Sequence, residues 1–82
     1  MLIDVDVDRF EGGYKIQFPI SQFKERTDLK MAIVIVTCFA NDMDLDPELE
    51  PDDLQEIIDK VTELGKAKFT VEIYEDGIEV DI

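Results

Sequence analysis

Residues 27–41 read TDLKMAIVIVTCFAN, and the conformation of this stretch decides the fold of the chain. Its centre is a run of β-branched residues, which favours a strand. In a helix, however, the large apolar residues form one broad stripe, with Lys30 and Thr37 on the opposite side. A strand here would be apolar on both faces, and the one other helix that the sequence predicts cannot cover both sides of a sheet. We therefore predict a helix over 28–41, with a strand over 31–40 as the alternative.

A second helix is predicted over residues 51–64. Its apolar residues recur at helical spacing and form a single stripe, which consists of Leu54, Ile57, Ile58, Val61 and Leu64. Pro51 suits the first turn of a helix, because a backbone N–H at that position has no partner within the helix. Gly65 follows as a natural C-terminal stop. Such a helix buries one face and leaves the other in water.

Hairpins are predicted on both sides of the helical region, over about residues 2–20 and 68–82. Each alternates apolar with polar residues, a period of two that is typical of half-buried strands. The first is interrupted by Gly-Gly at 12–13 and the second by Asp-Gly at 76–77, both signals for a tight turn. A chain of 82 residues is expected to form a single domain, 1–82. We predict an α+β fold, a two-layer ββααββ arrangement in which the antiparallel sheet of two hairpins is covered on its apolar face by two helices.

The turn dipeptides also predict which residues face each other across the strands. If both dipeptides are two-residue loops, Val7 lies opposite Phe18 and Glu72 lies opposite Asp81. The apolar sides then coincide in both hairpins. The second pair places like charges across a strand pair, which destabilises a sheet. Because this pair of like charges lowers the stability of the sheet, its presence suggests that the carboxylates serve in binding.

The composition restricts the partners of the chain. Asp and Glu number 21 against 8 Lys and Arg, so the formal net charge is −13, and 45% of the residues are hydrophobic, as in a globular protein. Nucleic acids and anionic membranes attract basic proteins, so neither is an expected partner. An acidic surface attracts a basic protein surface, including one that normally holds DNA or RNA. The alternative is that the charge confers solubility alone.

We expect the partner-binding carboxylates on the strands and in the central acidic connection. They are Asp4, Asp6, Asp8, Glu72, Glu79, Asp81, Asp42, Asp44, Asp46, Glu48 and Glu50. Residues on one side of a strand stand roughly 6.6–6.8 Å apart, similar to successive phosphates of a nucleic-acid strand. The resulting hypothesis is a small acidic protein-binding module. Its sharper form is a nucleic-acid mimic, of the kind a virus or mobile element would use, that inhibits a DNA- or RNA-binding protein by occupying its basic surface.

The helix predicted over 28–41 carries more apolar residues than a small monomer needs. The surplus consists of Met31, Val34, Ile35 and Cys38. It suggests a second buried face, either in the core against the other helix or against another subunit. Because Cys38 lies in an apolar run, its thiol is expected to be buried. The alternative function is therefore a homodimeric structural or assembly domain with no catalytic role.

Patterns for catalysis and cofactor binding are missing from the sequence. The chain has no histidine for a base, a triad or a metal site, and no glycine-rich phosphate loop, so we expect neither an enzyme nor a cofactor. One acidic run resembles an EF-hand calcium loop, and a calcium-responsive domain is the second alternative. Its weak candidates for metal ligands are Asp42, Asp44, Asp46 and Asp53. Pro47, however, stands where that loop needs glycine.

The sequence also predicts where the chain resides. Its N-terminus has no basic region followed by a long apolar segment, so no signal peptide is expected. The longest apolar run, within residues 31–40, is too short to span a bilayer. A single cysteine fits a reducing compartment. We therefore expect a cytoplasmic protein with no membrane partner.

Overall fold

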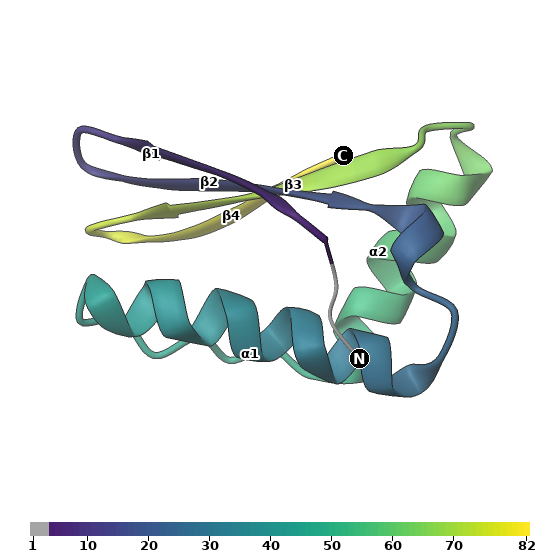
Figure 1. Cartoon of the computed structure of the whole chain (residues 1–82), viewed down its shortest axis with the longest axis horizontal. Helices are drawn as coiled ribbons and strands as arrows, with labels where there is room; N and C mark the ends of the chain where they lie inside the picture. The colour runs from purple at the N-terminus through teal and green to yellow at the C-terminus, as the bar shows by residue number, and fades with distance from the viewer. Residues whose placement is uncertain (1–3) are drawn as a thin grey trace.

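The computed structural model of the chain describes residues 4–82. Its elements, in chain order, are β1 (Asp6–Phe10), β2 (Gly13–Pro19), the short 3-10 helix η1 (Ile20–Gln22), α1 (Arg26–Asp42), α2 (Pro51–Glu63), β3 (Lys68–Tyr74) and β4 (Gly77–Asp81). The strands form one antiparallel sheet in the order β1-β2-β3-β4, and both helices lie on the same side of it (Figure 1). This arrangement confirms the predicted α+β ββααββ fold. Residues 2 and 3 of the first predicted hairpin lie outside the described part of the chain.

The core lies between the two central strands and the two helices. Its residues are Tyr14, Ile16, Phe18, Phe69, Val71 and Ile73 from the sheet, with Leu29, Ala32, Val36, Ala40, Leu54, Ile58 and Val61 from the helices. Phe18 and Phe69 stack across β2 and β3 with their ring centroids 5.2 Å apart. Burying a large apolar side chain contributes about 1.5–3 kcal/mol. Because β2 and β3 are neighbours, this burial joins the two hairpins into one sheet.

The ambiguous stretch, residues 31–40, lies within α1, so the predicted helix is confirmed. Ala32, Val36 and Ala40 recur at intervals of four residues, and all three are fully buried. A strand in this place would leave its second face without a covering layer, whereas the helix turns one stripe onto the sheet beside α2. Although α1 is largely apolar, no helix in residues 4–82 is long and apolar enough to cross a membrane.

Both hairpins turn one residue earlier than the sequence predicts. The loops are residues 11–12 and 75–76, because Gly13 and Gly77 each pair as the first residue of the following strand. A Cβ atom at Gly13 would lie 2.0 Å from the carbonyl oxygen of Ile73 in the neighbouring strand β3. Glycine at this position therefore permits the close approach of two strands and does not form the turn.

The earlier turns change the partners across each hairpin but not the faces. Val7 lies opposite Ile16, two residues from its expected partner, and Glu72 lies opposite Glu79 instead of Asp81. Because side chains alternate with a period of two, a shift of two residues returns each one to the same side of the sheet. Glu72 therefore still faces a like charge across the strands, but this charge belongs to Glu79.

Candidate functional site

One face of the sheet is left open by the helices (Figure 1), and the strands carry several carboxylates. The pairing register places five of them there: Asp6, Asp8, Glu72, Glu79 and Asp81. Asp4 precedes β1 and is exposed. The two hairpins therefore contribute carboxylates to a single surface.

Basic residues divide this open face into two acidic groups. Lys15 on β2 lies opposite Asp8 on one side and opposite Glu72 on the other. Lys68 donates from its Nζ to Oε1 of Gln17, 2.8 Å away. Strands β1 and β3 are two strand spacings apart, so the two acidic groups are separated by roughly 10 Å. The open face is a mixed surface and not a continuous row of carboxylates.

The acidic group on β3 and β4 is held by hydrogen bonds. The Tyr74 hydroxyl donates to the carboxylate of Glu72. Hydrogen bonding with the nearby Asp81 carboxyl lowers the pKa of Glu72 from its usual range, and the interaction with Glu72 raises the pKa of Asp81. The bond to Glu72 raises the pKa of Tyr74 to about 12. Glu72 therefore already has a hydrogen-bond partner within the sheet.

The connection between the helices forms a second acidic surface, in the helix layer. It runs back along α1 (Figure 1), and its residues alternate in burial as an extended chain does. The partly buried residues are Met43, Leu45, Pro47 and Leu49. The exposed residues are Asp44, Asp46, Glu48 and Glu50. We call residues 44–50 the acidic ribbon. The alternation MDLDPELE is present in the sequence and indicates an extended segment, a signal that the comparison with a calcium loop missed.

The carboxylates at the two ends of this connection also serve the helices. The Tyr14 hydroxyl donates to Asp42, the last residue of α1, and this hydrogen bond raises the pKa of Tyr14. Asp44 adopts the left-handed backbone, with φ 58°, that ends α1. Glu50 is the N-cap of α2. The two carboxylates in the middle of the ribbon take no part in a helix end.

The four aspartates that resemble calcium ligands do not converge. Asp42 bonds to Tyr14, and Asp53 accepts a hydrogen bond from the backbone of Glu50 at the start of α2. Between residues 4 and 82, no group of three or more Asp, Glu or Cys side chains is placed to hold a metal ion. The structure therefore offers no support for the calcium alternative.

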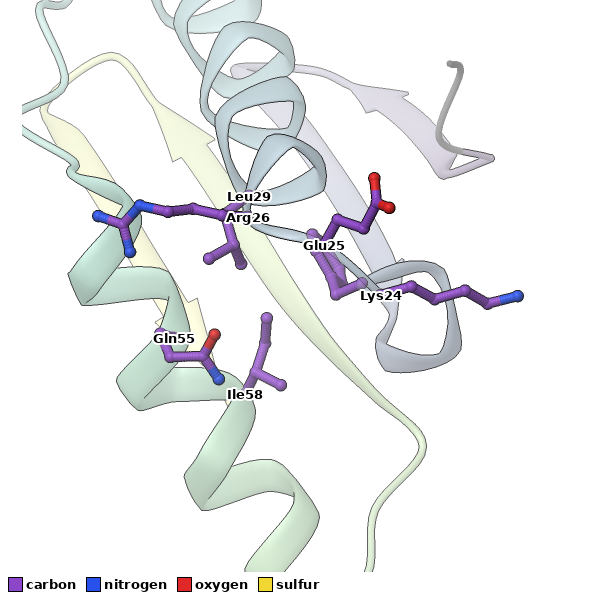
Figure 2. Close-up of a pocket in the computed structure, with 7 residues that line it drawn as sticks. Lys24, Glu25, Arg26, Leu29, Gln55 and Ile58 are labelled. Atoms are coloured by element: carbon purple, nitrogen blue, oxygen red, sulfur yellow. The ribbon is translucent and has the colours of Figure 1, made fainter.

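A hollow between the start of α1 and the middle of α2 was not anticipated from the sequence. Its volume is about 150 Å³, and its lining includes Lys24, Glu25, Arg26, Leu29, Gln55 and Ile58 (Figure 2). Pockets for drug-sized ligands enclose roughly 300–1,000 Å³. Figure 2 shows the charged ends of Lys24 and Arg26 pointing to opposite sides of the hollow. Because its polar groups diverge, we assign it no ligand.

The outward side of α1 leaves part of the apolar surplus in water. Val34 is 53% exposed and Cys38 is also exposed, whereas Met31 and Ile35 are partly buried against the core. The prediction of a buried thiol is therefore wrong. Val36 faces the core, and a residue two positions further along lies about 200° around the helix, on the far side.

No protein-family model matches the chain, and no match is found among curated proteins or solved structures.

Proposed function

We propose that this chain is a small acidic protein-binding module whose acidic ribbon occupies a basic surface of a partner protein. The alternation of burial over residues 43–50 supports this most directly, because it turns every ribbon carboxylate toward water. The sequence has no basic residue between Lys30 and Lys60, so nothing within this segment neutralises the charge. Arg26 belongs to a neighbouring element but pairs with Asp52 at 3.0 Å.

The ribbon is better suited to a basic partner than the open sheet face. On the sheet, Lys15 lies between the acidic groups, and the Glu72 carboxylate accepts a hydrogen bond from Tyr74. From Asp46 to Glu50 the ribbon carboxylates alternate with partly buried residues, a pattern that in an extended chain spaces them at roughly 6.6–6.8 Å. A row of like charges without interspersed cations speeds association with a basic surface, and salt weakens that attraction.

The partner class that we propose is a DNA- or RNA-binding protein, whose basic surface the chain blocks as a nucleic-acid mimic. Such surfaces bring Lys and Arg to successive phosphates along a strand. The ribbon carboxylates repeat at a similar spacing and carry the same sign of charge. An inhibitor of this kind fits a virus or mobile element that has to silence a nuclease or a repair protein.

A pull-down at low salt, with the tagged chain as bait and elution by a salt gradient, tests this proposal. We expect a basic nucleic-acid-binding protein that elutes as the salt concentration rises and that added DNA or RNA displaces. The double variant Asp46→Lys, Glu48→Lys should lose this capture, since neither carboxylate takes part in a helix end. A matched double variant on the sheet, Glu79→Lys, Asp81→Lys, has the same net charge and should retain it. Unchanged capture by the ribbon variant would refute the proposal, and equal loss in both would assign the binding to net charge alone.

A homodimeric assembly domain is the second candidate, and the exposure of Val34 favours it. Apolar residues on one outward side of a helix form the kind of patch that a second subunit covers. Gel filtration with light scattering should then show a dimer at high protein concentration, and Val34→Lys should shift it to a monomer. A strict monomer in the unmodified chain removes this candidate.

A further inference from the structure

Strand β1 is an edge of the sheet, and it pairs with β2 alone among the described strands. In an antiparallel pair, alternate residues direct their N–H and C=O groups away from the partner. β1 therefore presents unpaired backbone donors and acceptors along its outer edge. Such an edge is a template for an additional strand.

β1 also extends beyond the cover that the helices provide. The register places Val7 on the core-facing side, directly opposite Ile16. Ile16 is fully buried, yet Val7 is 38% exposed, and all five residues of β1 are exposed. Both helices pack against β3, nearer the middle of the sheet. The core-facing side of β1, which carries Val7 and Arg9, is consequently available to a neighbour.

One partly buried side of α1 lies next to this part of the sheet. The Phe39 ring lies 4.8 Å from the Tyr14 ring on β2, so this side of the helix faces the part of the sheet next to β1. Ile35 and Met31 precede Phe39 at intervals of four residues and therefore share this side. Both are only partly buried. A strand added beside β1 would bring its own apolar residues toward them.

The charge on the other face of β1 restricts what can pair with it. Asp6 and Asp8 point to the open face, and a residue directly opposite on an added strand would have its Cβ within about 4.5–5.5 Å. Like charges at that distance oppose pairing, so a second β1 is disfavoured. The other edge, β4, carries Glu79 and Asp81 on the same face and is disfavoured for the same reason. Lys or Arg opposite the two aspartates would instead be attracted.

We propose that the β1 edge binds an extended segment of another protein, in which Lys or Arg alternates with apolar residues, as a fifth strand of the sheet. Main-chain hydrogen bonds hold the segment to the edge, as in other cases of strand addition. Its basic side chains lie beside Asp6 and Asp8, and its apolar side chains lie beside Val7 and toward the partly buried side of α1 that carries Met31 and Ile35. The hydrogen bonds of this site come from β1, whereas the acidic ribbon lies in the helix layer, so the proposal does not rest on the ribbon carboxylates.

Titration of the full chain with synthetic peptides at physiological salt, followed by fluorescence anisotropy, tests this proposal. The probe is a peptide of alternating lysine and valine. The first control has the same composition with the lysines grouped in one half, and the second carries N-methyl groups on alternate backbone nitrogens. We expect the alternating peptide to bind at least roughly tenfold more tightly than either control, because only it combines edge hydrogen bonds with the correct faces.

Paired variants of the chain locate the binding. Asp6→Lys, Asp8→Lys should remove the preference for the alternating peptide, whereas the ribbon variant Asp46→Lys, Glu48→Lys should keep it. Amide hydrogen exchange in β1 should slow when the alternating peptide is bound. Equal affinity for the three peptides, no binding of any, or a preference that survives in the β1 variant would overturn the proposal. If the β1 variant does not fold, the peptide comparison and hydrogen exchange on the unmodified chain decide the question.

Discussion

Helices α1 and α2 begin with the same motif, Glu-x-x-Asp, but the two aspartates lie in different surroundings. The N–H of Glu25 donates to Asp28 at 2.9 Å in α1, and the N–H of Glu50 donates to Asp53 at 3.0 Å in α2. Asp28 is only 1% exposed and accepts a second hydrogen bond from the backbone of Lys24, whereas Asp53 is exposed. The same local motif therefore caps one helix at the surface and the other inside the protein.

The two helices also end with the same hydrogen-bond pattern. Leu45 N–H donates to the carbonyl of Ala40 at 2.8 Å, and Lys66 N–H donates to the carbonyl of Val61 at 3.0 Å. The residue before each donor is left-handed, with φ 58° at position 44 and 73° at position 65. Glycine fills the second position without strain, but aspartate fills the first. Helix α1 therefore keeps a less favourable end than α2, and this end starts the acidic ribbon.

The largest expected effect is the difference in stability loss when the capping aspartates Asp28 and Asp53 are each replaced by alanine. Asp28→Ala leaves the N–H groups of Lys24 and Glu25 without their acceptor in a part-buried place, so the free energy of unfolding should fall by about 2–3 kcal/mol. In Asp53→Ala, water can replace the carboxylate as acceptor for the N–H of Glu50, so the free energy of unfolding should fall by only about 0.5–1 kcal/mol. Urea unfolding of both variants measures the two losses. Equal losses would show that burial does not distinguish the caps.

The next effect concerns the end of α2. Gly65→Ala should lower the free energy of unfolding by about 1 kcal/mol, because a left-handed backbone is unfavourable for alanine. A Cβ atom at this position meets nothing within 4 Å, so the loss reports the backbone alone. Urea unfolding provides the measurement. An unchanged midpoint would mean that the end of α2 does not depend on glycine.

The corresponding change in α1 should stabilise the protein. Asp44→Gly relieves the left-handed aspartate and removes a negative charge near the C-terminus of the helix dipole, so we expect a gain of about 0.5 kcal/mol. Asp44→Asn is the matched control, because it removes the charge and keeps a side chain that tolerates this backbone. Thermal unfolding of the three proteins separates the two contributions. A loss of stability in Asp44→Gly would contradict the comparison.

The smallest effect is confined to alkaline pH and concerns the hydrogen bond between Tyr14 on β2 and Asp42 at the end of α1. The bond to Asp42 raises the pKa of Tyr14 in the folded state above its unfolded value near 10. The folded state therefore retains this proton more strongly, and its contribution is complete below pH 10 and lost as the pH rises past the folded pKa. Tyr14→Phe should make stability fall less steeply over this range, as followed by circular dichroism. An unchanged slope would argue against a stabilising bond between Tyr14 and Asp42.

The elements of this fold could be predicted because each has its own local period. The α2 stripe and the alternating hairpins show it directly, and α1 followed from the need to cover a sheet with helices. The register of the hairpins could not be predicted. A two-residue shift leaves every face unchanged, so the pattern does not choose between the two loops. In the first hairpin, the observed register brings Gly13 against the backbone of Ile73, which is far away in sequence.

The candidate surfaces were predictable to a similar degree. The faces of Asp6 and Asp8 follow from alternation along β1, and the exposed carboxylates of the ribbon follow from alternation of acidic and apolar residues over 43–50. The position of Lys15 between the acidic residues of β1 and β3 follows from the strand order, which places β2 between these two strands. Strand order is set by packing between distant segments, so the division of the open face could not be seen in advance.

The sequence by itself determined the charge of this protein, the type of each element and the direction in which alternating side chains point, since these depend on residues a few positions apart. The tertiary structure decided how deeply each residue is buried. It placed Val36 in the core and Val34 in water on one helix, and it buried Asp28 but not Asp53 behind the same motif. Burial is set by the elements that pack around a residue, and those come from distant parts of the chain.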